Sequence, residues 1–184
     1  MSDFEELVHR YEGRIFRFLA NSFGNPADAQ ELTQETFVSA YLNLRQLDVQ
    51  RSFAAWLFTI ARRKGIDRHR VTRPAEAELP DLPDLNDPAV ILSQREAEQE
   101  LWELARRTLP ELQFQALWLR YAEEMSVPQI AGVLRRTRVH VKVLLFRARN
   151  RLARVLKPER KWDDNVRTMG RLRPAMVAHE KVGK

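Results

Sequence analysis

The stretch RRTRVHVKVLLFRARNRL, Arg135 to Leu152, interleaves basic residues with valines and leucines. One face of a helix here would be apolar, because four residues recur at steps of four, three and four: Val141, Leu145, Ala148 and Leu152. Thr137 is suited to cap the start of that helix. The segment Ser126 to Leu134 just before it opens with the capping-box pattern Ser-Val-Pro-Gln. We therefore predict a helix-turn-helix, with the apolar stripe of its second helix packed on Ile130, Ala131 and Leu134.

The other faces of this second helix carry the basic residues. A major groove admits an α-helix, and phosphates attract its positive charge. An ordinary helical hairpin with a solvated charged face is the alternative. Under the first interpretation the residues available to DNA are Thr137, Arg138, His140, Lys142, Arg147 and Arg149.

Charge is segregated along the rest of the chain. The net charge is +10 over residues 135–161 and +6 over residues 49–74, but −8 over residues 75–104 between them. A chain charged only for solubility has no need for such blocks, whereas basic blocks on separate elements are typical of a nucleic-acid-binding protein.

Helical periodicity extends over most of the 184 residues, and no strand pattern interrupts it. The predicted helices begin near the N-terminus, at Pro26, after Ser52, at Ser93, at Glu111, after Ser126 and after Thr137. Between about residues 71 and 92 the period stops, and prolines alternate with acids. We expect an all-α protein of two small domains joined by an extended acidic linker.

Composition excludes several classes of protein. The chain has no cysteine, which rules out disulfide frameworks and thiolate metal sites. Its four histidines are scattered without metal-ligand spacing, and no phosphate loop or nucleophile elbow occurs. We expect a cytoplasmic protein that is not an enzyme, with no cofactor, no membrane insertion and no required homo-oligomer.

Three segments together resemble a known family. DAQELTQETFVSAYLNL (residues 28–44), FAAWLFTIARRKGIDRHR (53–70) and LPELQFQALWLRYAEEMSVPQIAGVLRRTRVHVKVLLFRARNRL (109–152) resemble regions 2.2, 2.3–2.4 and 4 of the sigma-70 family, in its extracytoplasmic function (ECF) group. The resemblance implies region 2 at residues 1–70, a linker at 71–92 and region 4 at 93–156. It leaves residues 157–184 as a C-terminal extension of unknown role.

The resemblance also implies roles for residues in the first half. One side of the helix that starts at Pro26 would dock on the β′ subunit of RNA polymerase core, through Asp28, Glu31, Gln34 and Glu35. The promoter −10 element would be held by a loop and by the basic end of the next helix, through Asp48, Gln50, Arg51, Ser52, Arg62, Arg63, Lys64, Arg68 and Arg70. Acids that merely solvate their helix are the alternative reading of the first set.

Trp56 could stack on an unpaired base. It shares a stripe with other apolar residues, however, so we predict that it belongs to the core, together with Phe53, Leu57, Ile60 and Ala61. For the helix that starts at Pro26 we predict an apolar face of Leu32, Phe37, Ala40, Tyr41 and Leu44.

In the second half, the resemblance implies that the helix-turn-helix reads the −35 element. The small polar residues that the family carries early in the second helix are replaced here by Val139, His140 and Val143. The acidic linker either passes through the polymerase cleft or serves as a flexible tether.

The function implied is that of an alternative sigma factor, which binds the β′ and β subunits of polymerase core and directs initiation at promoter DNA. A stand-alone helix-turn-helix regulator is the alternative, but it would leave the first half without a role. The resemblance leaves open control by an anti-sigma factor, by phosphorylation or by the C-terminal extension.

Overall fold

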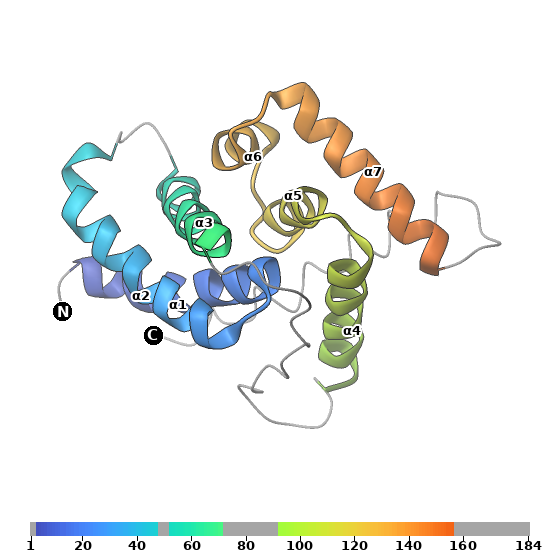
Figure 1. The fold of residues 1–184 in the computed structure, drawn as a ribbon, viewed down its shortest axis with the longest axis horizontal. Helices are drawn as coiled ribbons and strands as arrows, with labels where there is room; N and C mark the ends of the chain where they lie inside the picture. The colour runs from blue at the N-terminus through green and yellow to red at the C-terminus, as the bar shows by residue number, and fades with distance from the viewer. Residues whose placement is uncertain (1–2, 48–51, 72–91, 157–184) are drawn as a thin grey trace, which may run out of the picture. The chain divides into compact units, whose positions relative to one another are not determined.

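The computed structural model describes residues 3–47, 52–71 and 92–156 (Figure 1). Within these ranges the chain forms seven α-helices and one short 3₁₀ helix, without a strand, which confirms the all-α class. The chain divides into two compact units, the first containing α1 to α3 and the second containing α4, α5 and α7. The predicted linker at 71–92 and the extension at 157–184 fall almost wholly outside the described residues.

The first unit is a bundle of α1 (Asp3–Phe23), α2 (Pro26–Asn43) and α3 (Phe53–Val71), each packed on the other two. The 3₁₀ helix η1 (Leu44–Gln46) follows α2. Asn25 caps α2 as its neighbour Pro26 predicts, and its Oδ1 accepts hydrogen bonds from the backbone N–H groups of Ala27 and Asp28. Core side chains come from all three helices: Ile15, Phe18, Leu19, Leu32, Phe37, Leu57 and Phe58.

The predicted apolar face of α3 is wrong, because the face that is buried is rotated by part of a helical turn from the predicted one. Leu57 and Ala61 are fully buried as expected, but the large aromatic in the core is Phe58, whose ring centroid lies 5.2 Å from that of Phe18. Trp56 is only half-buried, against Phe53. Close contact between α1 and α3 decides this register, because Gly65 faces the ring of Phe23 with no room for a Cβ.

Trp56→Ala is therefore expected to lower the free energy of unfolding by only about 1–2 kcal/mol, whereas Phe58→Ala should cost about 3–5 kcal/mol. The difference arises because truncating Phe58 leaves a cavity, while truncating Trp56 removes a side chain that already meets solvent. Hydrogen exchange of the α3 amides in the full chain measures both. Equal losses of unfolding free energy for the two variants would show that Trp56 belongs to the core.

The second unit contains α4 (Leu92–Thr108), α5 (Glu111–Tyr121) and α7 (Arg138–Leu156), and the division between the units falls within the intervening α6 (Val127–Leu134). Its core holds an aromatic cluster in which the Trp102 and Trp118 ring centroids are 4.7 Å apart, with Phe114 beside both. The indole N–H of Trp118 donates to Glu123 Oε1 at 3.2 Å, which satisfies both groups inside the unit. Helix α7 runs along α5 and touches α4 (Figure 1).

The apolar stripe of α7 is buried as predicted, at Val141, Leu145, Ala148 and Leu152, joined by Leu144. Helix α7 makes its most extensive backbone approaches to α5, followed by α4. An eight-residue α6 is too short to cover a nineteen-residue helix, and the longer α5 offers the larger apolar surface.

Candidate functional site

Acids of α2 and cations of α3 meet in one cluster. Arg68 reaches three carboxylates, with its Nη1 atom 2.9 Å from Glu31 Oε2 and 3.5 Å from Asp28 Oδ1, and its Nη2 atom 3.1 Å from Glu35 Oε1. Lys64 Nζ donates to Glu35 Oε2 at 3.0 Å. We call these five residues the α2–α3 ion-pair network. It joins residues predicted to bind polymerase to residues predicted to bind DNA, which the sequence had placed in separate sites.

The network has an electrostatic consequence at Glu31. The hydrogen bond and the charge of Arg68 hold the pKa of the Glu31 carboxyl below its ordinary value, and the same contacts raise the pKa of Arg68. Stability from this pair is thus present above the unfolded-state pKa of glutamate and is lost as pH falls through the lower folded-state pKa. The Glu31 side chain is 59% exposed, so salt screens the pair.

The other predicted residues of the first unit lie around this network. Gln34 is exposed on α2. Arg63 is exposed and lies 3.9 Å from Asp67, Arg70 is exposed at the end of α3, and Arg62 is half-buried. Ser52 caps α3, where its Oγ accepts the Ala55 N–H at 3.4 Å. Asp48, Gln50 and Arg51 lie outside the described residues.

The sequence analysis missed an apolar patch at the end of α2. Val38, Tyr41 and Leu42 are 60%, 64% and 74% exposed, so the placement of Tyr41 on the buried face was wrong. The ring of Tyr41 packs edge-on against Phe4 of α1, with centroids 5.2 Å apart. Exposed large apolar groups beside acids are typical of a surface that binds another protein.

The helix-turn-helix formed by α6 and α7 is closed by local hydrogen bonds. Ser126 and Gln129 form the predicted capping box, with Ser126 N–H donating to Gln129 Oε1 at 2.8 Å. Thr137 Oγ1 accepts the His140 N–H at 3.1 Å and caps α7 as predicted. Between them Arg136 N–H donates to Ala131 carbonyl at 3.0 Å, and Arg135 takes a left-handed φ of 51°.

That φ leads to a prediction at Arg135. A non-glycine residue in the left-handed region is strained, and glycine is the usual residue at such a helix end. Arg135→Gly is expected to raise the free energy of unfolding by about 0.5–1 kcal/mol. The matched control is Arg136→Gly, at the next residue, whose φ is not left-handed and which should be destabilised. Thermal unfolding compares the two, and a destabilised Arg135→Gly contradicts the prediction.

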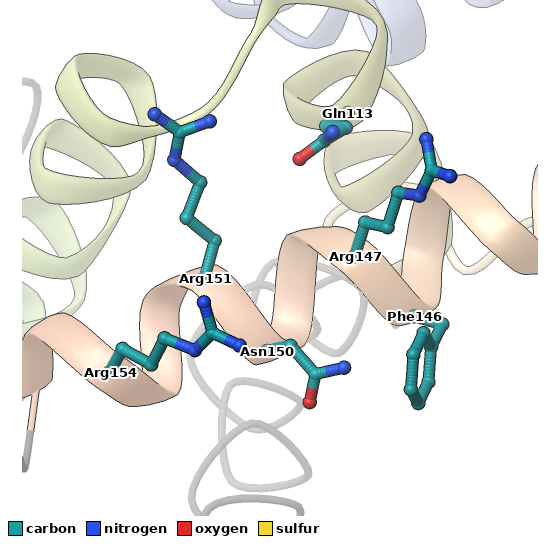
Figure 2. Close-up of a pocket in the computed structure, with 6 residues that line it drawn as sticks. All are labelled: Gln113, Phe146, Arg147, Asn150, Arg151 and Arg154. Atoms are coloured by element: carbon teal, nitrogen blue, oxygen red, sulfur yellow. The ribbon is translucent and has the colours of Figure 1, made fainter.

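The basic residues of α7 are mostly exposed. Arg138, His140, Lys142 and Arg147 all face solvent, as the apolar stripe predicted. Arg149 is different, because it is half-buried and its Nε is enclosed without a hydrogen-bond partner in the described part of the chain. The last helical turns of α7 add cations that sequence reasoning did not single out. These cations belong to an open pocket, which is lined by Gln113 of α5 and by five residues of α7: Phe146, Arg147, Asn150, Arg151 and Arg154 (Figure 2).

The described residues offer neither a metal site nor a membrane span. No group of three histidine or acidic side chains could hold a metal ion there. None of the helices in the described ranges is long and apolar enough to cross a membrane.

Comparisons with known proteins find two matching family models, one in each half of the chain. Residues 7–74 match the family model of sigma-70 region 2, and residues 100–152 match that of sigma-70 region 4. Among curated relatives, the ECF RNA polymerase sigma factor SigW of Bacillus subtilis is 27% identical over 84% of this chain and 89% of that protein. The corresponding factor BldN of Streptomyces coelicolor is 30% identical over 83% of this chain and 60% of that protein.

Solved structures show the same similarity. The structure of CnrH in complex with the cytosolic domain of CnrY superposes with a TM-score of 0.60, at 27% identity, over 85% of this chain and 89% of CnrH. The two matched regions together cover more than half of the chain and follow each other in the expected order. This chain therefore belongs to the sigma-70 family, in its ECF group.

Proposed function

We propose that this protein is an alternative sigma factor, which binds RNA polymerase core and directs promoter-specific initiation. One observation carries the proposal. A single chain holds a region 2 bundle with an acidic and apolar face on α2, and a region 4 helix-turn-helix with an exposed basic surface on α7. A stand-alone helix-turn-helix regulator would need only the second of these.

The docking surface that we propose for the core enzyme lies on α2. It combines Asp28, Glu31, Gln34 and Glu35 with the exposed Val38, Tyr41 and Leu42. Acids would meet basic residues of the β′ subunit and the apolar patch would supply buried area, since affinity needs desolvated apolar contacts as well as complementary charge. Because Arg68 and Lys64 pair with these acids in the free chain, docking would exchange internal ion pairs for intermolecular ones.

The −10 element is proposed to lie against the residues around the start and the basic end of α3. Opening a duplex costs a few kcal/mol of unstacking, which contacts to the unpaired bases must offset. The half-buried Trp56, near Ser52, is available as an aromatic platform for such a base. Arg62, Arg63 and Arg70 are suited to the phosphates, and Lys64 and Arg68 belong to the α2–α3 ion-pair network.

The −35 element is proposed to receive α7. Its exposed cations would neutralise phosphates on the walls of the major groove. A protein that binds the free sigma factor is also proposed as a partner, since the related CnrH was solved in complex with the cytosolic domain of CnrY. A site of action in the cytoplasm follows from the proposed partnership with polymerase.

Reconstitution tests the function. Core polymerase is mixed with the purified chain, and run-off transcripts from genomic templates are mapped at their 5′ ends. A sigma factor yields discrete starts that share two upstream elements and vanish without the chain. A stand-alone regulator does not co-purify with core and supports no initiation.

Lys142→Ala tests the role of α7 on the mapped promoter. Losing one phosphate contact is expected to reduce the salt slope of holoenzyme binding by about one unit, whatever the base sequence. Binding titrations at several salt concentrations measure the slope. Arg10→Ala, an exposed cation of the first unit, is the matched control and should leave the slope unchanged. An unchanged slope for Lys142→Ala contradicts the assignment.

A further inference from the structure

Helix α7 carries an exposed apolar ridge that the cationic residues do not explain. Val139, Val143 and Phe146 are 72%, 37% and 55% exposed, although the first two are β-branched aliphatics that gain nothing from water. At about 3.6 residues per turn, steps of four and three keep the three on one side of the helix. That side is opposite the buried stripe that begins at Val141. We call Val139, Val143 and Phe146 the apolar ridge.

Cations flank the ridge on both sides. The same helical period places Arg138 and Lys142 along one edge, and His140 and Arg147 along the other. All four are exposed. Figure 2 shows the end of this arrangement, with Phe146 and Arg147 leaving the α7 ribbon as neighbours. The exposed surface of α7 is thus apolar at its centre and basic at its margins.

This pattern restricts what can cover the ridge. An apolar protein groove would bury the flanking cations without partners, which costs several kcal/mol per charge. A plain polyanion would match the cations but would leave the valines without a contact. The major groove of DNA has both features, because phosphates line its two walls, about 12 Å apart, and base edges form its floor.

The group on that floor that matches a valine is the thymine methyl. Base edges in the major groove otherwise present hydrogen-bond donors and acceptors, which an aliphatic side chain cannot satisfy. We propose that Val139 and Val143 contact thymine C5-methyl groups in the −35 element and so specify thymine there. The cations on either side would contact the phosphates that line the groove walls. This inference rests on the proposed function, and it assigns base discrimination to residues that the charge pattern did not suggest.

The test uses holoenzyme made from the full chain and core polymerase, with a duplex that carries the −35 element mapped above. Each thymine on either strand is replaced in turn by deoxyuridine, which lacks only the methyl group. At one or two positions the wild-type protein should bind the deoxyuridine duplex about threefold to fivefold more weakly, as expected for one lost methyl contact.

The valine variants then complete a double-mutant cycle. Val139→Ala and Val143→Ala should each bind the thymine duplex more weakly by a similar factor. Each variant should also bind thymine and deoxyuridine duplexes equally well at the base that its valine contacts. Val155→Ala is the matched control, since Val155 is 50% exposed on the same helix but outside the ridge, and it should behave as wild type. All three sites are exposed, so thermal unfolding should be nearly unchanged.

Several results would overturn the inference. Replacing thymine by deoxyuridine could leave the affinity unchanged at every position, or the element could contain no thymine. The valine variants could also lose the same factor of affinity for the thymine duplex and for the deoxyuridine duplex. Val139→Ala and Val143→Ala could also spare DNA binding and weaken holoenzyme assembly, which would make the ridge a protein contact. In each case a weakened Lys142→Ala would still support α7 as the −35 helix. If Lys142→Ala also leaves promoter binding and its salt slope unchanged, the proposed function of α7 fails too.

Discussion

Trp118→Ala is expected to unfold the second unit or to lower its stability by about 3–5 kcal/mol, the range for large aromatic truncations in cores. Trp118 is 3% exposed and forms the middle of the aromatic cluster with Trp102 and Phe114. Small domains have a total stability of only about 5–15 kcal/mol, so this loss is a large share. The consequence for function would be loss of −35 recognition, with first-unit contacts to core retained.

Hydrogen exchange in the full chain measures this loss unit by unit, without assuming a single unfolding transition. Amides of α5 and α7 should lose protection, while those of α1 to α3 should not. Trp118→Phe is the matched control: it keeps an aromatic ring and removes the N–H that donates to Glu123, at an expected cost of about 1–3 kcal/mol. A Trp118→Ala variant with wild-type protection would show that the cluster does not hold the unit together.

Reversing charge at Glu31 and Glu35 together, by Glu→Lys at each position, is expected to weaken binding to polymerase core about a hundredfold. Like charges placed opposite one another at an interface cost several kcal/mol, and a hundredfold corresponds to about 2.7 kcal/mol. Titration of labelled chain with core enzyme at low and moderate salt gives the affinity. Circular dichroism of the same samples reports whether the first unit is still folded.

The α2–α3 ion-pair network complicates that experiment, and Arg68→Ala resolves it. In the structure both acids pair with Arg68, so the double variant also breaks internal contacts. Arg68→Ala removes the Arg68 contacts of both acids and leaves the acids available, with Lys64 still paired to Glu35, so this variant should bind core as well as wild type or better. If Arg68→Ala weakens binding as much, the acids act through the fold and not through docking.

The sequence alone was sufficient for everything whose cause lies within a few residues. The caps at Ser126 and Thr137 were predicted because a side chain and the backbone N–H group three residues later are always neighbours at a helix start. The buried stripe of α7 was predicted for the same reason, because helical period alone aligns its apolar residues. The family resemblance likewise rested on local motifs, and the matched regions bear it out.

What the tertiary structure decided depends on residues far apart in the chain. Glu31 and Arg68 are separated by 37 positions, and no pattern in either segment signals their pairing. Phe58 rather than Trp56 enters the core because Gly65 lets α3 approach Phe23 of α1, which sets the rotation of the whole helix. Tyr41 stays largely exposed although its ring packs on Phe4 of α1, and Val139 and Val143 are outermost on α7 because α5 and α4 cover its opposite side. A helix specifies its own period, but only its neighbours determine which of its faces is turned inward and which remains for a partner.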